Sequence, residues 1–292
     1  MNSAEKAKKQ YRRRDFFQSL CFLSPSLLGV ALFFILPFGV VVYYSLIDGT
    51  ASKSFVGLQN FVNLFKNSAF LLASKNTLHF SLIAVPLAVV LALGLAVMLE
   101  SRIPCKSWFR SFFLSPMMVP VASVVLIWQV LFNVNGTVNQ LFNINYDWLL
   151  SDHAQIVGVL LFLWKNLGYN MIPFMAGLSN IPTNLIEVAR VEGASEAYIF
   201  FNLKLRYLSP TILFVTILSL INSFKVFREV YLLAGDYPYE SLYMLQHFMN
   251  NTFKSLDYQK LSAAAVIMAI VMVFVILLLF WAEDRFGKDI EG

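Results

Sequence analysis

The sequence predicts an all-α membrane protein with six transmembrane helices, and two observations support this fold class. Hydrophobic residues make up 58% of the 292 residues and charged residues only 13%, a composition unlike that of soluble globular domains. The charged residues are also segregated, so that long stretches without Asp, Glu, Lys or Arg separate short charged segments. A helix needs about 20 apolar residues to cross a bilayer, and each long stretch is therefore a candidate span.

The six predicted spans follow these stretches in order. The first has a longer apolar region than a cleaved signal sequence and no small-residue cleavage site before Asp48, so we expect it to remain as an anchor. The fourth differs from the others because it carries Lys165 near its middle. The predicted spans are Phe22–Leu46 between Asp15 and Asp48, Thr77–Leu99 between Lys75 and Glu100, Ser111–Phe132 between Arg110 and Asp147, Ala154–Leu178, Tyr207–Phe227 after Arg206, and Leu261–Trp281 between Lys260 and Glu283.

The distribution of positive charge predicts the orientation of the chain. With the N-terminus in the cytoplasm, the inner segments carry fourteen Lys and Arg residues and the outer segments carry five. Cytoplasmic loops are enriched in these residues, so we expect both termini and the segment 181–210 to be cytoplasmic. The basic residues of the N-terminal tail then lie next to anionic lipid or in solvent.

The polar segment between the fourth and fifth spans is predicted to form two short helices. Asn184 can cap the first, with Glu187 in the capping-box position three residues later, and Ser195 followed by Glu196 can open the second. Gly193 is expected to form the turn between them. A polar, charge-mixed loop of this length between two spans indicates a partner in the cytoplasm.

We expect no catalytic, cofactor or metal site in this chain. Gly287-Lys288 lacks the other residues of a phosphate-binding loop, and the three histidines fall on separate segments without Cys or carboxylate at ligand spacing. Cys21 and Cys105 fall in or near the inner leaflet, so a disulfide is not expected.

The segment from Ile181 to Pro210 resembles the EAA loop of ABC importer permeases. The resemblance rests on Glu187-Val188-Ala189 followed four residues later by Gly193. Further motifs in the order typical of carbohydrate permeases, of the maltose, glycerol-phosphate and multiple-sugar type, extend it over about residues 22–281. These motifs are Phe55-Val56-Gly57-Leu58-Gln59-Asn60-Phe61, Asn76-Thr77, Trp108-Phe109-Arg110, Pro116, Pro120, Trp128, Leu131-Phe132, Gly136, Asn139, Trp164-Lys165 before Pro173, Leu178-Ser179-Asn180-Ile181-Pro182 and Lys225-Val226-Phe227.

The resemblance implies the fold and function of a type I ABC importer permease for a sugar or oligosaccharide, in the bacterial cell (inner) membrane. Its implied partners are a second homologous permease, a cytoplasmic ABC ATPase dimer and an external substrate-binding protein. ATP and Mg²⁺ would bind to the partner ATPase, with no cofactor in this chain. The residues implied to couple the chain to the ATPase are Glu187, Ala189, Gly193 and Ala194.

The resemblance also implies a plan of domains: a basic cytoplasmic tail (1–15), a first transmembrane helix with an external loop (16–71), a permease core (72–282) with a cytoplasmic coupling loop (181–207), and a cytoplasmic C-terminal tail (283–292).

Two departures from the family pattern stand out. Arg206 occupies a position where the family usually has Pro, which removes a preset helix start. The external segment Leu232–Glu240 is shorter and poorer in glycine than usual.

Two alternative functions remain open at this point. Within the family, the solute could be a glycerol phosphate or a polyol instead of a sugar. Outside it, the chain could be a channel or a secondary transporter that needs no ATPase. The predicted spans contain no acidic residue, which argues against a proton-coupled transporter.

The substrate pathway is predicted from polar residues inside the spans. Lys165, Asn166, Tyr169 and Asn170 share one helix face, and Pro173 leaves the carbonyl of Tyr169 without its usual donor. Donors, acceptors and a ring together suit a sugar. The alternative is that these groups bond helix to helix, or that the charged residues 225–229 lie in an outer aqueous vestibule. The remaining pathway candidates are Asn222, Lys225 and Gln129.

Overall fold

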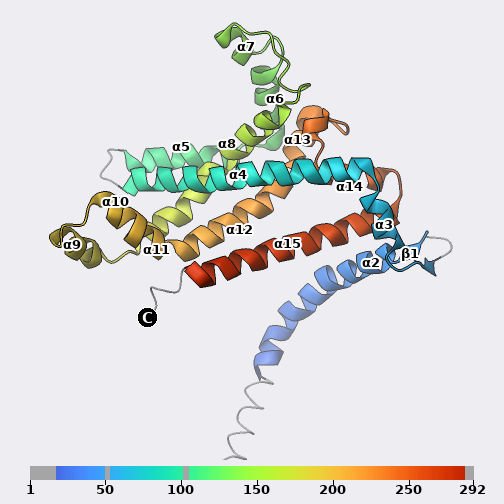
Figure 1. Ribbon diagram of the computed structural model, residues 1–292, viewed down its shortest axis with the longest axis horizontal. Coiled ribbons are helices and arrows are strands. Elements are labelled where there is room, and N and C mark those ends of the chain that lie inside the picture. Colours follow the sequence, from blue (N-terminus) through green and yellow to red (C-terminus); the bar gives the residue numbers. More distant parts are fainter. Residues whose placement is uncertain (1–17, 50–52, 101–104, 287–292) are drawn as a thin grey trace, which may run out of the picture. The chain divides into compact units, whose positions relative to one another are not determined.

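The computed structural model describes residues 18–49, 53–100 and 105–286 (Figure 1). This part of the chain is mostly helical, with one short hairpin, and contains six stretches of helix long and apolar enough to cross a membrane. The prediction of six spans is confirmed. The six candidate spans are Gln18–Ser45, Ser68–Glu100, Val121–Phe142, Ala154–Ser179, Ser209–Ala234 and Tyr258–Arg285.

The chain forms two compact units. The first contains the described residues up to Leu64 together with Leu256–Met268, and the second contains Phe65–Ser255 and the residues from Ala269 onward. The last helix, α15 (Tyr258–Phe286), contributes residues to both units.

The first unit begins with the apolar helix Gln18–Ser45. This helix includes a π-helical turn, η1 (Ala31–Ile35), and ends as α2 (Leu36–Ser45). A hairpin follows, in which β1 (Ile47–Asp48) pairs antiparallel with β2 (Ser54–Phe55).

Asn60 joins this hairpin to the end of α2. It lies in α3 (Gln59–Phe65), and its side-chain nitrogen donates to the carbonyl oxygens of Ser45 and Ile47 at 3.0 and 2.9 Å. The last carbonyls of a helix have no donor within the helix, so the amide of Asn60 satisfies a group that would otherwise need water.

Three long helices form the core of the second unit. Helix α4 (Ser68–Glu100) packs along α8 (Ala154–Ser179), and α12 (Ser209–Lys225) packs against both. Small side chains at every fourth position of α4 let its neighbours approach closely. The fully buried ones are Ala84, Ala88, Ala92 and Ala96.

Glycines in α8 permit two close helix contacts. A Cβ atom at Gly168 would lie 1.9 Å from the carbonyl oxygen of Phe113 in α5 (Lys106–Met118). A Cβ atom at Gly177 would lie 2.7 Å from Leu208 Cδ2, just before α12. At Gly168 the two backbones therefore lie closer than a side chain would permit, and at Gly177 the Leu208 side chain occupies the place of a Cβ atom.

The prediction of one continuous third span over Ser111–Phe132 is wrong. The chain forms α5, which packs on α8, and then α6 (Val121–Phe132), which packs against α13. Val119 between them is extended, and Pro120 caps α6. Proline lacks an N–H and disfavours helical backbone at the residue before it, so the helix ends there and changes direction (Figure 1).

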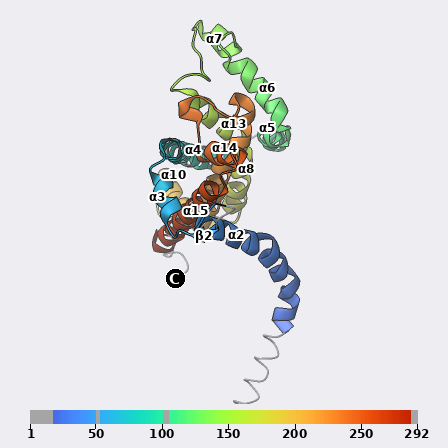
Figure 2. The same ribbon diagram turned by 90° about the vertical axis from the view of Figure 1, so that its right-hand side faces the viewer.

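A short helix, α7 (Thr137–Phe142), follows α6, and both extend away from the pair α4 and α8 in Figure 1 and Figure 2. Asn139 is 3% exposed and organises the connection. It donates to the carbonyl oxygens of Val134 and Tyr146 and accepts from the Trp148 indole at 2.7 Å.

The fifth span is longer than predicted. Helix α12 is followed, after a break at Val226, by α13 (Phe227–Ala234), and the apolar stretch continues to Ala234. Glu229 therefore lies within a span, and the expectation that the spans contain no acidic residue is wrong. The chain then forms η3 (Glu240–Leu242) and α14 (Leu245–Lys254), which packs on α4.

The segment between α8 and α12 folds into a helical pair. Helix α9 (Thr183–Val191) is followed by a second helical stretch made of α10 (Glu196–Tyr198), the π-helical η2 (Ile199–Lys204) and α11 (Leu205–Tyr207). The prediction of two helices is confirmed, and the second is longer than a single short helix.

Candidate functional site

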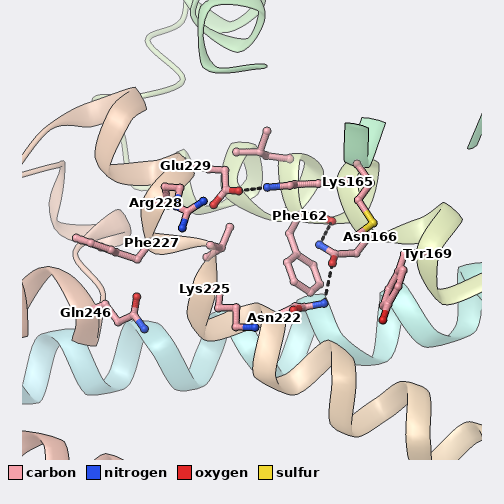
Figure 3. A pocket seen from close by; sticks show the side chains of 13 residues that line it. Phe162, Lys165, Asn166, Tyr169, Asn222, Lys225, Phe227, Arg228, Glu229 and Gln246 are labelled. Atoms are coloured by element: carbon pink, nitrogen blue, oxygen red, sulfur yellow. Dashed lines mark hydrogen bonds and ion pairs between the residues drawn. The ribbon is translucent and has the colours of Figure 1, made fainter. Parts of the chain in front are cut away.

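A cavity of about 380 Å³ lies where α8 meets the junction of α12 and α13 (Figure 3). Met117 of α5 and Gln246 of α14 also line it. Ligand pockets in proteins span about 300 to 1,000 Å³, so the space suits a small solute. Five of the seven residues predicted for the substrate pathway line this cavity: Lys165, Asn166, Tyr169, Asn222 and Lys225.

Lys165 forms an ion pair with Glu229 across the cavity wall (Figure 3). Glu229 is 5% exposed, and its second oxygen, Oε2, has no hydrogen-bond partner among the described residues. A lysine within a span is unfavourable unless it faces water or a partner. Glu229 is that partner, and the pair is neutral as a unit.

Two asparagines are held in a fixed arrangement beside this pair. The Asn222 side chain donates to Asn166 Oδ1 at 3.1 Å, and Asn166 donates to the carbonyl oxygen of Phe162 at 2.8 Å. The first bond joins α12 to α8, and the second lies within α8. Each amide keeps some capacity for further bonds, so the pair can both connect the helices and contact a solute.

Asn170 and Gln129 are not among the residues that line the cavity. Asn170 is 1% exposed and donates to Ser219 Oγ at 2.8 Å, which joins α8 to α12 inside the core. Gln129 of α6 donates to the carbonyl oxygen of Leu233 in α13 at 3.4 Å. For these two residues, the structure places the side chains in bonds between helices.

The cavity also has lining residues that the pathway prediction omitted. Arg228 follows the helix break at Val226, and its position in the sequence indicated only an outer vestibule. Gln246 lies on α14, a helix too polar to be recognised from hydropathy. Its position depends on a bond from the Leu245 amide to Thr77 Oγ1 at 2.8 Å, a contact between distant segments.

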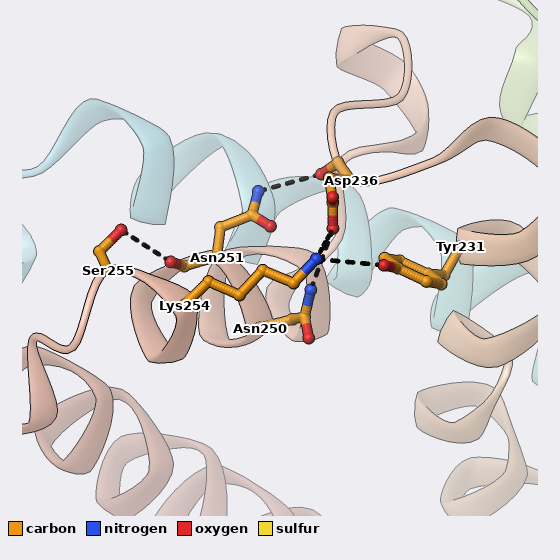
Figure 4. Close-up of polar contacts among 6 residues, drawn as sticks. All are labelled: Tyr231, Asp236, Asn250, Asn251, Lys254 and Ser255. Atoms are coloured by element: carbon orange, nitrogen blue, oxygen red, sulfur yellow. Dashed lines mark hydrogen bonds and ion pairs between the residues drawn. The ribbon is translucent and has the colours of Figure 1, made fainter.

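A polar cluster joins the end of α13 to α14 (Figure 4). Lys254 donates to Asp236 at 2.5 Å and to the Tyr231 hydroxyl at 3.1 Å. The hydrogen bond from Lys254 lowers the pKa of the Asp236 carboxyl and raises the pKa of Lys254. Asn251 donates to the Asp236 carbonyl oxygen at 3.0 Å, so the short segment after α13 is held by side chains of α14.

The turn between α9 and α10 has the geometry expected of Gly193. Its φ is +87°, a conformation that residues with a side chain rarely adopt. The Ala194 amide donates to the carbonyl oxygen of Ala189 at 2.9 Å across this turn. Ser195 accepts from the Tyr198 amide and caps α10, as predicted. Asn184 does not cap α9, which begins after Pro182 without a side-chain cap; that prediction is wrong.

Two ion pairs connect this loop, one between its two helices and one to α4. Arg190 of α9 donates to Glu196 of α10 at 2.6 Å, and this hydrogen bond lowers the pKa of the Glu196 carboxyl. Lys204 of η2 donates to Glu100 at the end of α4 at 2.7 Å. The loop is thereby connected to a long core helix of the second unit.

The outer surface of this loop is apolar and exposed. Val191 is 89% exposed, Phe201 63%, and Val188 and Tyr198 56% each. Of the predicted coupling residues, Glu187 and Ala189 lie on α9, and Gly193 and Ala194 lie in the turn that follows it. Glu187 and Gly193 are exposed, while Ala189 and Ala194 are partly buried.

Arg206, the departure from the family pattern, lies in α11 and is exposed. Helix α12 nevertheless begins with a proline in its first turn, because Pro210 follows Ser209. The fixed φ of proline favours a helix start. The preset start that position 206 lacks is therefore supplied four residues later.

Comparisons with known proteins give a consistent result. A family model described as "Binding-protein-dependent transport system inner membrane component" matches residues 84–292. The chain is 30% identical over 274 residues to the sn-glycerol-3-phosphate transport system permease protein UgpA of Yersinia enterocolitica, covering 89% of this chain and 92% of that protein. It is 30% identical over 280 residues to UgpA of Salmonella typhimurium, covering 91% and 92%.

Among solved structures, the chain shares its fold with a chain of a bacterial ABC transporter involved in the import of the acidic polysaccharide alginate. The TM-score is 0.80 at 19% identity, covering 97% of this chain and 100% of that chain. The same holds for the bacterial alginate ABC transporter in complex with an alginate pentasaccharide-bound periplasmic protein, with a TM-score of 0.79 at 20% identity, covering 96% and 98%.

Proposed function

Because the chain belongs to the family of binding-protein-dependent transport system inner membrane components, we propose that it is the permease subunit of an ATP-driven carbohydrate importer. In this role it crosses the bacterial inner membrane several times, with both termini in the cytoplasm. It forms the translocation pathway with a second homologous permease and receives its solute from an external binding protein. ATP and Mg²⁺ bind to an ATPase dimer, and this chain performs no catalysis.

The observation that carries this proposal is the exposed helical pair between α8 and α12 in a member of this family. Its apolar side chains, Val188, Val191 and Tyr198, have no cover within the described residues. The turn is fixed by Gly193 and by the Arg190–Glu196 ion pair. A rigid, apolar protrusion on the cytoplasmic side suits docking in a cleft of the ATPase.

In the proposed mechanism, closure of the two ATPase subunits moves this loop, and the loop moves the helices to which it is joined. The Lys204–Glu100 ion pair and the chain connections to α8 and α12 carry that motion. The cavity wall is made from α8, α12 and α13, so displacement of these helices would change access to the solute. This is alternating access by movement of rigid elements.

The side chains that line the cavity are suited to bind a polyhydroxyl solute. Asn166 and Asn222 offer amide donors and acceptors, and Tyr169 offers a ring and a hydroxyl. A second solute, sn-glycerol 3-phosphate, is favoured by the similarity to the UgpA proteins, which are permeases of sn-glycerol-3-phosphate transport systems. Both solutes carry several hydroxyl groups, and the same amides can serve either.

The test is copurification followed by transport in proteoliposomes. When a tagged chain is expressed together with the proteins encoded by adjacent genes, an ATPase and a second permease should copurify with it. The reconstituted complex should take up sugar only with ATP on the cytoplasmic side, and an ATPase variant that cannot hydrolyse ATP should abolish uptake.

A gradient-driven transporter would give a different result in this test. Glu229 lies in a span, and carboxylates within spans carry protons in gradient-driven transporters. Uptake by the purified chain by itself, driven by a proton gradient and indifferent to ATP, would replace the importer with a secondary transporter.

A further inference from the structure

The charges that line the cavity do not cancel. Three cations, Lys165, Lys225 and Arg228, and one carboxylate, Glu229, line it. Lys165 pairs with Glu229, which leaves two positive charges without a counter-charge in the lining. A cavity for a neutral sugar needs hydroxyl partners and does not need such an excess.

Lys225 and Arg228 differ in this respect from Lys254 and Lys204, two cations of the second unit that have a carboxylate partner. Lys254 pairs with Asp236, and Lys204 pairs with Glu100. No carboxylate among the described residues lies within ion-pair distance of Lys225 or Arg228, although Glu229 is the next residue after Arg228. Both cations also lie within the candidate span Ser209–Ala234, where a positive charge is unfavourable unless it faces water or a partner.

The break at Val226 brings the two cations to one wall of the cavity. Lys225 is the last residue of α12 and Arg228 lies in the first turn of α13. Figure 3 shows Lys225 next to Asn222 and Arg228 next to Glu229. The first turn of α13 also lines the cavity through Phe227, and the positive end of the helix dipole adds to the potential of the two side chains.

We propose that this cavity receives a polyhydroxyl solute that carries a carboxylate or phosphate group, with Lys225 and Arg228 as the residues that bind the anion. Arginine suits either group because its guanidinium donates two parallel hydrogen bonds to two oxygens. Asn166 and Asn222 then serve the hydroxyl groups, and Tyr169 covers one face of the solute. The ion pair with Lys165 keeps Glu229 from repelling the anion. This inference rests on the proposed function and names the chemistry of its solute.

The experiment uses the complete reconstituted importer with its binding protein. Uptake is measured for probes that share a polyhydroxyl skeleton and differ in the charged group: glucose, glucuronate and glucose 6-phosphate, and also glycerol and glycerol 3-phosphate. The variants are Lys225→Gln, Arg228→Gln and the double substitution. Lys66→Gln is the matched control, because Lys66 is an exposed cation of the same unit that does not line the cavity.

At least one anionic probe should be imported in preference to its neutral partner. The double variant should reduce its uptake about tenfold or more at low concentration, as expected for the loss of charged hydrogen bonds, whereas Lys66→Gln should leave it unchanged. Arg228→Lys should restore part of the uptake. Import of the uronate alone assigns a carboxylate to the site, and import of the phosphate esters alone assigns a phosphate.

The inference is overturned if only neutral probes are imported, or if the double variant imports the anionic probe as the wild type does. Both results leave the importer assignment intact. The proposed function fails on a different result, namely that no ATPase and no second permease copurify with the chain, so the two failures are distinguishable.

Discussion

Neighbouring polar residues on α8 have different roles because they meet different partners. Asn170 is buried and bonded to Ser219 of α12, whereas Tyr169, one residue earlier, lines the cavity. Spacing along a helix places such residues on a shared face, but it does not say how deeply each one is covered by a neighbouring helix. The sequence could therefore predict that these polar residues share one face of the helix. It could not predict which of them line the cavity and which pack against another helix.

Tyr169→Ala should weaken uptake of the solute without affecting assembly. Loss of the ring removes a stacking contact of about 1 kcal/mol, so the KM for uptake should rise about fivefold. Tyr169→Phe keeps the ring and should stay close to wild type. Equal uptake kinetics for all three proteins would remove Tyr169 from the pathway.

Asn170→Ala should act on stability instead. It leaves the buried hydroxyl of Ser219 without its donor, a loss of about 1 to 3 kcal/mol, and it should lower the unfolding temperature in detergent with little change in KM. A normal unfolding temperature together with a large rise in KM would instead indicate that Asn170 contacts the solute.

Stability should also fall at low pH because of His247. This residue is fully buried, its Nδ1 accepts from the Met244 amide, and burial lowers its pKa to about 4, with Asp236 opposing the shift. The unfolded chain, with a pKa of about 6.5, binds the proton more tightly. Stability from the neutral ring is therefore present above about pH 6.5 and is lost as the pH falls toward 4.

Thermal unfolding between pH 7.5 and 4 measures this effect. His247→Asn should flatten the dependence on pH over that range, whereas His153→Asn, at an exposed histidine, should not. An unchanged slope in the His247 variant would assign the acid sensitivity to other groups.

At the scale of elements, hydropathy predicted the number of spans correctly. It did not predict where the helices within them are broken. The run Ser111–Phe132 contains no charged residue, so hydropathy alone did not show that the helix is divided at Pro120. Helix α14 could not be recognised as a wall of the cavity, because its place depends on Thr77 and Asn76 of α4. Such distant contacts carry no local signal.

Gly193→Val should disturb the turn between the two helices of the loop that joins α8 to α12. A β-branched residue at φ +87° is strained by about 1 to 3 kcal/mol, although no atom lies within 4 Å of the added Cβ. The protein should still insert, while uptake per ATP hydrolysed should fall about tenfold. Gly94→Val is the control, since it adds the same side chain in open space on α4 at ordinary helical φ. Equal uptake by both variants would contradict a coupling role for this turn.

At the scale of the whole molecule, the orientation rests on the distribution of Lys and Arg. In a background with Cys21→Ser and Cys105→Ser, Ser195→Cys should react with a membrane-impermeant thiol reagent only from the cytoplasmic side. Ser54→Cys should react only from outside, because it lies in the hairpin after the first span. The reverse labelling pattern would invert the chain and place the loop between α8 and α12 on the wrong side for an ATPase.

Cross-linking from Val191 tests the central claim, that this loop docks on an ATPase, most directly. Val191 is 89% exposed at the end of α9 and Tyr237 is 77% exposed on the segment after α13. In the purified complex, in the same background without native cysteines, Val191→Cys carrying a short photoactivated cross-linker should link to the ATPase subunit, and ATP should change the yield. Tyr237→Cys with the same reagent should not link to it. Cross-links to the ATPase from position 237 and none from position 191 would contradict the account.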